Sequence, residues 1–158
     1  MALVLAVEPD HRQAMILKRI VRELVRADLV LVDSRDAAVA ALTARIPDVI
    51  LLTALLSPRD EEELVAYLRT LAGAHHIQTH TIPQLASTAA DKEKNGRGLF
   101  GMLLGKREAA PSPVMGGCDP DLFADEIRTF IEAATARKSE SVDALQQRAA
   151  HLLSLIHI

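Results

Sequence analysis

The sequence predicts an α/β domain in three layers, with a parallel sheet between two layers of helices. Short apolar runs of strand length alternate along the chain with longer segments in which apolar residues recur every three or four positions. The connections between these segments are short, and alternating strand and helix units of this kind form parallel sheets covered by helices on both faces. The 158 residues suffice for one such domain with a sizeable core and are few for two.

Five segments have the composition of strands. Residues 3–7, 29–32 and 49–53 are mostly apolar and branched, which is typical of strands buried on both faces of a parallel sheet. Residues 77–82 are a weaker candidate, because their polar side chains suit a partly exposed position. A very short fifth strand is predicted over residues 113–115. The expected sheet therefore has five strands.

Helix-start signals follow the first three strands and precede the last helix. Asp10, Ser34 and Ser57 each stand where a side-chain oxygen accepts from a first-turn amide. Asp119 and Pro120 open the last helix in a similar way. An apolar stripe follows each signal and is expected to face the sheet. The residues of these stripes are Ile16, Leu17, Ile20, Val21, Leu24 and Val25, then Ala38, Ala41, Leu42 and Ile46, then Leu64, Val65, Leu68 and Leu71, and finally Phe123, Ile127, Phe130, Ile131 and Ala134.

Composition and charge exclude several function classes. The formal net charge of −3 gives no reason to expect nucleic acid as a partner. No apolar run is long enough to cross a bilayer, and the first residues lead into a strand instead of a signal peptide, so a cytoplasmic location is expected. Cys118 is the only cysteine, which excludes an internal disulfide and a cysteine-built zinc site. It is interpreted as a small residue at a helix start, a place that favours a lowered pKa. No cofactor is implied.

Residues 84–113 break the alternating pattern, because no sustained periodicity runs through them. A connection of this length is unusual in a compact domain and indicates either a functional or a disordered loop. Two interpretations stay open: a remnant helix or loop beside the sheet, or a short element that docks on a membrane surface or a partner groove. The glycines of residues 96–105 weaken any helix there and favour the first interpretation, a remnant helix or loop beside the sheet. The candidate docking residues are Leu99, Phe100, Met102, Leu103, Leu104, Lys106 and Arg107.

Four short motifs follow one another in a specific order. They are LAVEPD at residues 5–10, PDVILL at 47–52, LR at 68–69 and DP at 119–120. In this order and at this spacing they resemble the receiver domain of bacterial two-component response regulators. The resemblance covers about residues 3–82 and 114–136. It implies a flavodoxin-like, receiver-like fold with strand order 2-1-3-4-5 and a degenerate fourth-helix region.

The same resemblance implies a phosphorylation pocket at the carboxyl ends of the strands. In the family, an acidic pair after the first strand binds magnesium through oxygen ligands. An aspartate at the end of the third strand accepts the phosphoryl group, a Ser or Thr ends the fourth strand, and a Lys follows the fifth. The matching positions in this chain are Glu8, Pro9, Asp10, Thr53, Thr81 and Gly116.

Most of that chemistry is missing from the matching positions. Pro9 has no side-chain oxygen to offer a metal, and Thr53 cannot form an acyl phosphate. Gly116 carries no charge to neutralise phosphate. No metal site is assigned, and Glu8 and Asp10 remain the only candidate ligands for a cation. The resemblance therefore implies a pseudo-receiver, which keeps the fold and lacks the phosphoacceptor aspartate.

The chain divides into three parts. Residues 1–137 form the receiver-like domain, and residues 84–113 are an irregular insertion or loop within it. Residues 138–152 begin a helical linker with near-heptad apolar spacing. Residues 153–158 look like a translated sequencing-library adapter and are expected to be a non-native scar, so the natural protein would continue into a further region.

These expectations favour a signalling module that is not an enzyme and works by protein contact through its last helix and the neighbouring strand. It would be the N-terminal part of a larger bacterial regulatory protein. One alternative is a response regulator still linked to a phosphorelay through an unusual site. Another is an adaptor that docks residues 96–107 on a membrane or a partner. An enzyme or small-ligand domain would need a Gly-rich phosphate loop after the first strand, and residues 8–11 do not form one.

Overall fold

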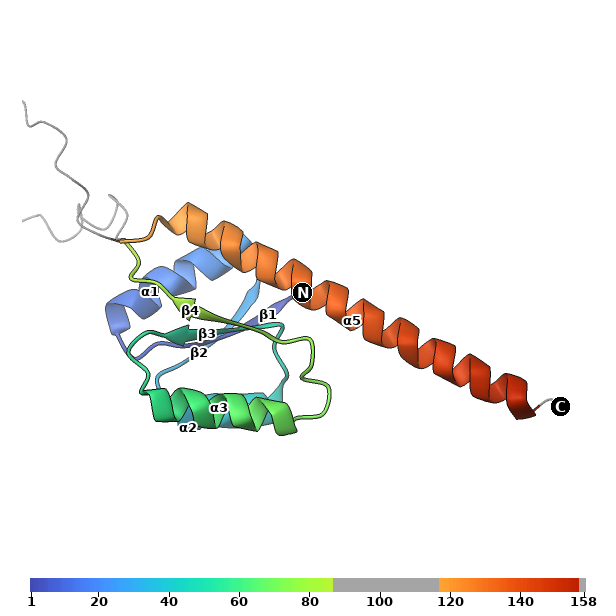
Figure 1. Ribbon diagram of the computed structural model, residues 1–158. Helices are drawn as coiled ribbons and strands as arrows, with labels where there is room; N and C mark the ends of the chain where they lie inside the picture. Colours follow the sequence, from blue (N-terminus) through green and yellow to red (C-terminus); the bar gives the residue numbers. More distant parts are fainter. Residues whose placement is uncertain (87–116, 157–158) are drawn as a thin grey trace, which may run out of the picture.

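A parallel sheet lies between two layers of helices, and one long helix runs out beyond them (Figure 1). The computed structural model describes residues 1–86 and 117–156. Its elements, in chain order, are β1 (Leu3–Val7), α1 (His11–Arg19), the π-helix η1 (Ile20–Val25), β2 (Asp28–Val32), α2 (Arg35–Ala44), β3 (Val49–Thr53), α3 (Pro58–Thr70), β4 (Gln78–Ile82) and α5 (Pro120–Ile156). The α/β class and the three-layer arrangement are confirmed.

The sheet has the order β2-β1-β3-β4, and all its pairs are parallel. This is the predicted order for the first four strands. The prediction of five strands is corrected, because the described residues contain four. The segment expected to form the fifth, residues 113–115, lies outside the described part of the chain, as does the expected fourth-helix region. A single parallel bridge between Leu85 and Cys118 brings the chain back beside the end of β4.

The central strands β1 and β3 are buried at every position. Each has a neighbour on both sides and helices over both faces, as their branched apolar side chains predict. The same expectation is wrong for residues 29–32, since Val30 and Leu31 in β2 are each 36% exposed. Among the described strands, β2 pairs only with β1 and forms the edge of the sheet. Its composition alone therefore did not predict how far it is buried.

Two apolar layers hold the helices on the sheet. On one face, Leu17, Ile20 and Phe123 pack against β1 and β3 side chains below α1, η1 and α5. On the other face, Leu42 and Leu64 pack below α2 and α3. Period-2 alternation of β1 and β3 side chains supplies both layers at once. Apart from Ala134, which is also buried, the predicted stripe residues of the first and last helices belong to the first layer or contact it.

The first helix changes its hydrogen-bonding pattern halfway along. Asp10 caps α1 by accepting from the Gln13 amide at 2.9 Å, as its spacing predicted. From Ile20 to Val25 the helix continues as η1, which ends at Arg26 in the left-handed conformation, with φ of 60°. The sequence pattern did not reveal this change, because a single π-helical stretch leaves the apolar stripe on nearly the same face.

Helix α5 is much longer than the domain it covers (Figure 1). Its buried residues are Phe123, Ala124, Ile127 and Ala134. Beyond Ala134 the helix continues without a break through the predicted linker, and its apolar side chains there are exposed. Within the described residues, no helix has the length and apolar character needed to cross a membrane.

Gly117 is required where the chain returns to the sheet edge. The amide of Cys118 donates to the Gln84 carbonyl at 2.7 Å, and that of Ala86 donates to the Cys118 carbonyl at 3.0 Å. A Cβ added to Gly117 would lie 2.6 Å from the Ala86 nitrogen and 2.7 Å from its Cα. The clash is with backbone, which cannot rotate away.

Gly117→Ala is therefore expected to lower the free energy of unfolding by about 1–3 kcal/mol, the usual size of an overpacking effect. Urea titration followed by far-UV circular dichroism measures it. Gln84→Ala is the matched control, because the Gln84 side chain is exposed on the same pair of segments. Equal stability of the Gly117→Ala variant and the wild type would contradict the close approach.

Candidate functional site

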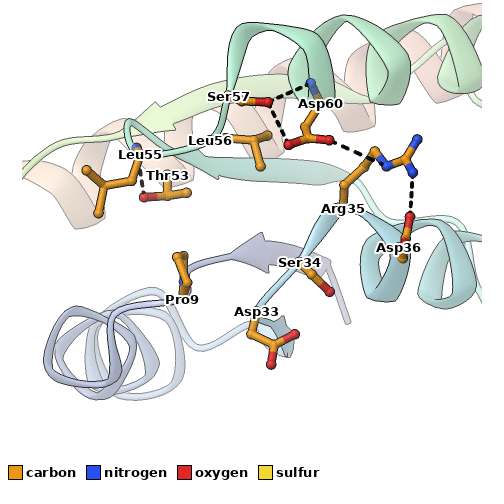
Figure 2. Close-up of a pocket in the computed structure, with 10 residues that line it drawn as sticks. All are labelled: Pro9, Asp33, Ser34, Arg35, Asp36, Thr53, Leu55, Leu56, Ser57 and Asp60. Atoms are coloured by element: carbon orange, nitrogen blue, oxygen red, sulfur yellow. Dashed lines mark hydrogen bonds and ion pairs between the residues drawn. The ribbon is translucent and has the colours of Figure 1, made fainter.

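A shallow cavity opens at the carboxyl ends of the strands, where parallel α/β sheets place their ligands. Its volume is about 360 Å³. It lies between the loops that follow β1, β2 and β3, so each loop contributes side chains to it (Figure 2). The lining residues are Pro9, Asp33, Ser34, Arg35, Asp36, Thr53, Leu55, Leu56, Ser57 and Asp60.

Thr53 ends β3 and stands at the wall of this cavity, as its place in the sequence predicted. Its side chain is not free. The residue is 5% exposed, and its hydroxyl oxygen accepts from the Leu55 amide at 3.2 Å (Figure 2). The hydroxyl therefore helps to form the turn that leads into α3, which is a structural task.

The acidic position after β1 is occupied by local hydrogen bonds. Glu8 is 6% exposed, and its carboxylate accepts from the Asp10 amide at 2.9 Å. The Asp10 carboxylate caps α1. Pro9 between them lines the cavity, whereas Glu8 and Asp10 do not. Within the described residues, no three His, Cys, Asp or Glu side chains gather as metal ligands.

Thr81 lies apart from Thr53. In the register of β3 and β4, Thr81 pairs with Leu52, and Thr53 pairs with Ile82. Side chains of successive strand residues point to opposite faces, so the two hydroxyls do not face the same space. Thr81 is exposed and does not line the cavity. Gly116 and the docking candidates of residues 99–107 lie outside the described residues.

Among the described residues, Arg35 is the one basic residue in the cavity wall, and carboxylates surround it. Its guanidinium contacts Asp36 at 2.6 Å, Asp60 at 3.8 Å and also Glu63 (Figure 2 shows the first two). Partial desolvation works to lower the pKa of Arg35, but the carboxylates of Asp36 and Glu63 outweigh it, and the pKa is raised. Arg35 therefore joins α2 to α3, and the neighbouring carboxylates offset the positive charge that it keeps.

The resulting charge balance disfavours an anion. The cavity wall carries three carboxylates, from Asp33, Asp36 and Asp60, against the single guanidinium. Within the described part of the chain, a phosphoryl group placed here would face net negative charge from the cavity wall. The described side chains thus offer neither a carboxylate at the end of β3 to accept phosphate nor a basic group committed to binding it.

Comparison with known proteins gives a fold and no family. No protein-family model matches the chain, and no curated protein matches its sequence. Solved structures do match. One is the structure of a transiently phosphorylated "switch" in bacterial signal transduction, with 16% identity, a TM-score of 0.51, and coverage of 85% of this chain and 97% of the other. The likeness shows a shared fold. A response regulator from Hahella chejuensis is also similar, with 20% identity, a TM-score of 0.45, and coverage of 60% and 71%.

Two side-chain clusters were not predicted from the sequence. One is the set of ion pairs of Arg35 described above. The other lies at the opposite, amino-terminal edge of the sheet, where Asp48 contacts Lys138 and His76. Its partners are separated by 90 and 28 residues, so no local pattern could have joined them.

Cys118 also differs from its expectation. The pKa of its thiol is raised, first by burial and then by the nearby carboxylates of Glu126 and Asp119. The helix start was expected to lower it. Desolvation and negative charge prevail because Cys118 precedes α5 beside the end of β4, where the Leu85 bridge covers it.

Proposed function

We propose that this chain is a receiver-like signalling module that accepts no phosphoryl group and acts through protein contacts. The observation that carries the proposal is Thr53, a buried residue at the end of β3 whose hydroxyl is engaged by the Leu55 amide. A threonine hydroxyl without a neighbouring base is a poor nucleophile and forms no acyl phosphate. The acidic cavity wall adds a second obstacle, because it repels the donor.

Helix α5 and strand β4 supply the face through which such a module would bind a protein. His80 in β4 lies 4.6 Å, ring to ring, from Phe130 in α5, and its Nε2 lies 3.2 Å from a Glu126 carboxylate oxygen. All three side chains are partly or well exposed. A half-exposed aromatic pair with a polar rim is the composition of a protein-binding patch. The module would be one part of a larger bacterial regulatory protein in the cytoplasm.

Treatment with acetyl phosphate and Mg²⁺, followed by intact-mass spectrometry, tests the proposal. The wild-type chain is expected to gain no phosphoryl group, because the described residues place no carboxylate at the end of β3 and no paired metal site at the cavity. Pro9→Asp with Thr53→Asp is the matched comparison, since it restores two carboxylates beside Glu8 and is expected to raise the affinity for Mg²⁺. Stoichiometric phosphorylation of the wild type would sink the proposal, and peptide mapping would then locate the unusual acceptor that the phosphorelay alternative requires.

A further inference from the structure

Asp48 joins three separate parts of the fold at the amino-terminal edge of the sheet. It is 7% exposed and precedes β3. Its amide donates to the Leu3 carbonyl at 2.8 Å, and its carbonyl accepts from the Gln78 amide at 3.0 Å. Its side-chain Oδ2 accepts from the Leu3 amide at 2.8 Å. The backbone and one carboxylate oxygen are thus committed to the starts of β1 and β4, which leaves Oδ1 for other partners.

Two basic side chains lie next to that same Oδ1 atom. The Lys138 ammonium of α5 donates to it, and the Nε2 of His76 lies 3.9 Å away. The two differ in their access to water. The His76 side chain is 6% exposed, whereas that of Lys138 is 46% exposed. Lys138 can therefore exchange its carboxylate for water at small cost, and His76 cannot.

His76 is held neutral in this arrangement. Its Nε2 lies 3.2 Å from the Pro47 carbonyl, which only accepts, so the Nε2 carries the proton and Nδ1 is the atom that gains one in acid. Burial and the charge of Lys138 lower the pKa of His76, and the opposing effect of Asp48 is smaller. The other group beside it is His75, whose ring centroid is 5.8 Å away. A charged His75 also opposes a second charge on His76.

The Lys138 contact lies where α5 leaves the domain. Ala134 is the last buried residue of the helix, and the residues after it are exposed except for Ser141, which is half-buried. Ser141 accepts from or donates to the exposed His75 ring at 2.8 Å. Since the Ser141 hydroxyl also lies within hydrogen-bond distance of the Arg137 and Lys138 carbonyls, it can donate to a carbonyl and accept from the His75 ring, so this contact is not an ion pair. The Asp48 contact is therefore the one that a proton can break.

We propose that Asp48, His76 and Lys138 form a proton-dependent latch on α5. When His76 gains a proton at Nδ1, the buried imidazolium takes Asp48 as its counter-ion, and Lys138 moves into water. The segment of α5 after Ala134 then loses its ion pair to the sheet edge, while the apolar contacts of Phe123 and Ile127 keep the first half of the helix docked. The latch controls how firmly the projecting helix is held at its exit from the domain, and it is independent of phosphate.

Amide hydrogen exchange of the full chain, corrected for the intrinsic effect of pH and compared with an NMR titration of His76, tests the latch. As pH falls from about 8, exchange in the α5 segment after Ala134 is expected to rise about fivefold once His76 protonates, and because the pKa of His76 is lowered, the rise comes below the ordinary histidine value of about 6.5. This is the size expected for the loss of one half-exposed ion pair. The first half of α5 is expected to stay protected.

Three substitutions separate the latch from general acid loosening. His76→Gln keeps a donor for the Pro47 carbonyl and removes the titration, so the pH response of α5 should disappear. Lys138→Gln should leave the exit loose at every pH and raise the titration midpoint of His76, because a nearby cation is lost. Arg137→Gln removes the same charge one residue away. It should neither loosen the exit of α5 nor move the titration midpoint of His76. The proposal is overturned by an undiminished pH response in His76→Gln or by an unmoved His76 midpoint in Lys138→Gln. If His76→Gln does not fold, protonation of wild-type His76 without increased α5 exchange overturns it equally.

Discussion

Replacing Phe123 with alanine is expected to lower the free energy of unfolding by about 3–5 kcal/mol. Phe123 is fully buried and is the largest residue in the layer between α5 and the sheet. Its removal takes away the transfer free energy of a phenyl ring and leaves a cavity that Val4, Leu51 and Ile127 cannot fill without moving. Small domains are stabilised by only about 5–15 kcal/mol, so this one change removes a large part of the total.

Urea denaturation followed by far-UV circular dichroism measures the Phe123 effect. Leu122→Ala is the matched control, because Leu122 is adjacent in α5, also apolar, and 63% exposed. It is expected to change stability by less than about 0.5 kcal/mol. If the two variants lost similar free energy, Phe123 would not anchor α5 as the structure places it.

Asp48→Ala is expected to cost about 2–4 kcal/mol. The change removes the acceptor of the Leu3 amide, which is buried at the start of β1, and leaves that donor unsatisfied. It also removes the ion pair with Lys138, whose half-exposed ammonium can return to water. Asp125→Ala is the control, because Asp125 pairs with Arg128 on the exposed side of α5 and should contribute less than about 1 kcal/mol.

The pH dependence of stability gives a second measurement on Asp48. Burial works to raise its pKa, but the bonds from Lys138 and Leu3 prevail, and the pKa is lowered from its ordinary value of 3.8. The folded state therefore prefers the carboxylate more than the unfolded state does. The contribution of the Asp48 carboxylate to stability is complete well above the ordinary pKa of 3.8. It is lost as the pH falls through the lowered pKa of the folded state. Urea titrations at about pH 6 and about pH 3 should show a smaller acid loss in Asp48→Ala than in the wild type; equal losses would contradict the assignment.

Most of the fold could be predicted from local sequence patterns. The runs that form β1, β3 and β4, the caps Asp10, Ser34 and Ser57, and the stripe of α5 each express their structure over a few residues. Burial of β2 could not be predicted in this way. An apolar run has the same composition in the centre and at the edge of a sheet, and only the strand order decides how many neighbours it has.

Some features of the candidate site could likewise be predicted from the sequence, and others could not. The residue types at Thr53 and Pro9 can be read from the sequence, and neither of them carries a carboxylate. That Thr53 closes a turn with Leu55, and that Thr81 points away from it, depends on strand register and loop geometry. A shift of one residue in β4 would have reversed the second result.

The sequence by itself determined the α/β class, the order of the elements and the residue types at the end of β3, because periodicity, caps and residue types act locally. Only the tertiary structure brought Asp60 and Glu63 to Arg35, and Lys138 and His76 to one oxygen of Asp48. Such contacts join segments tens of residues apart, and their strength depends on distance and burial, which no stretch of sequence contains.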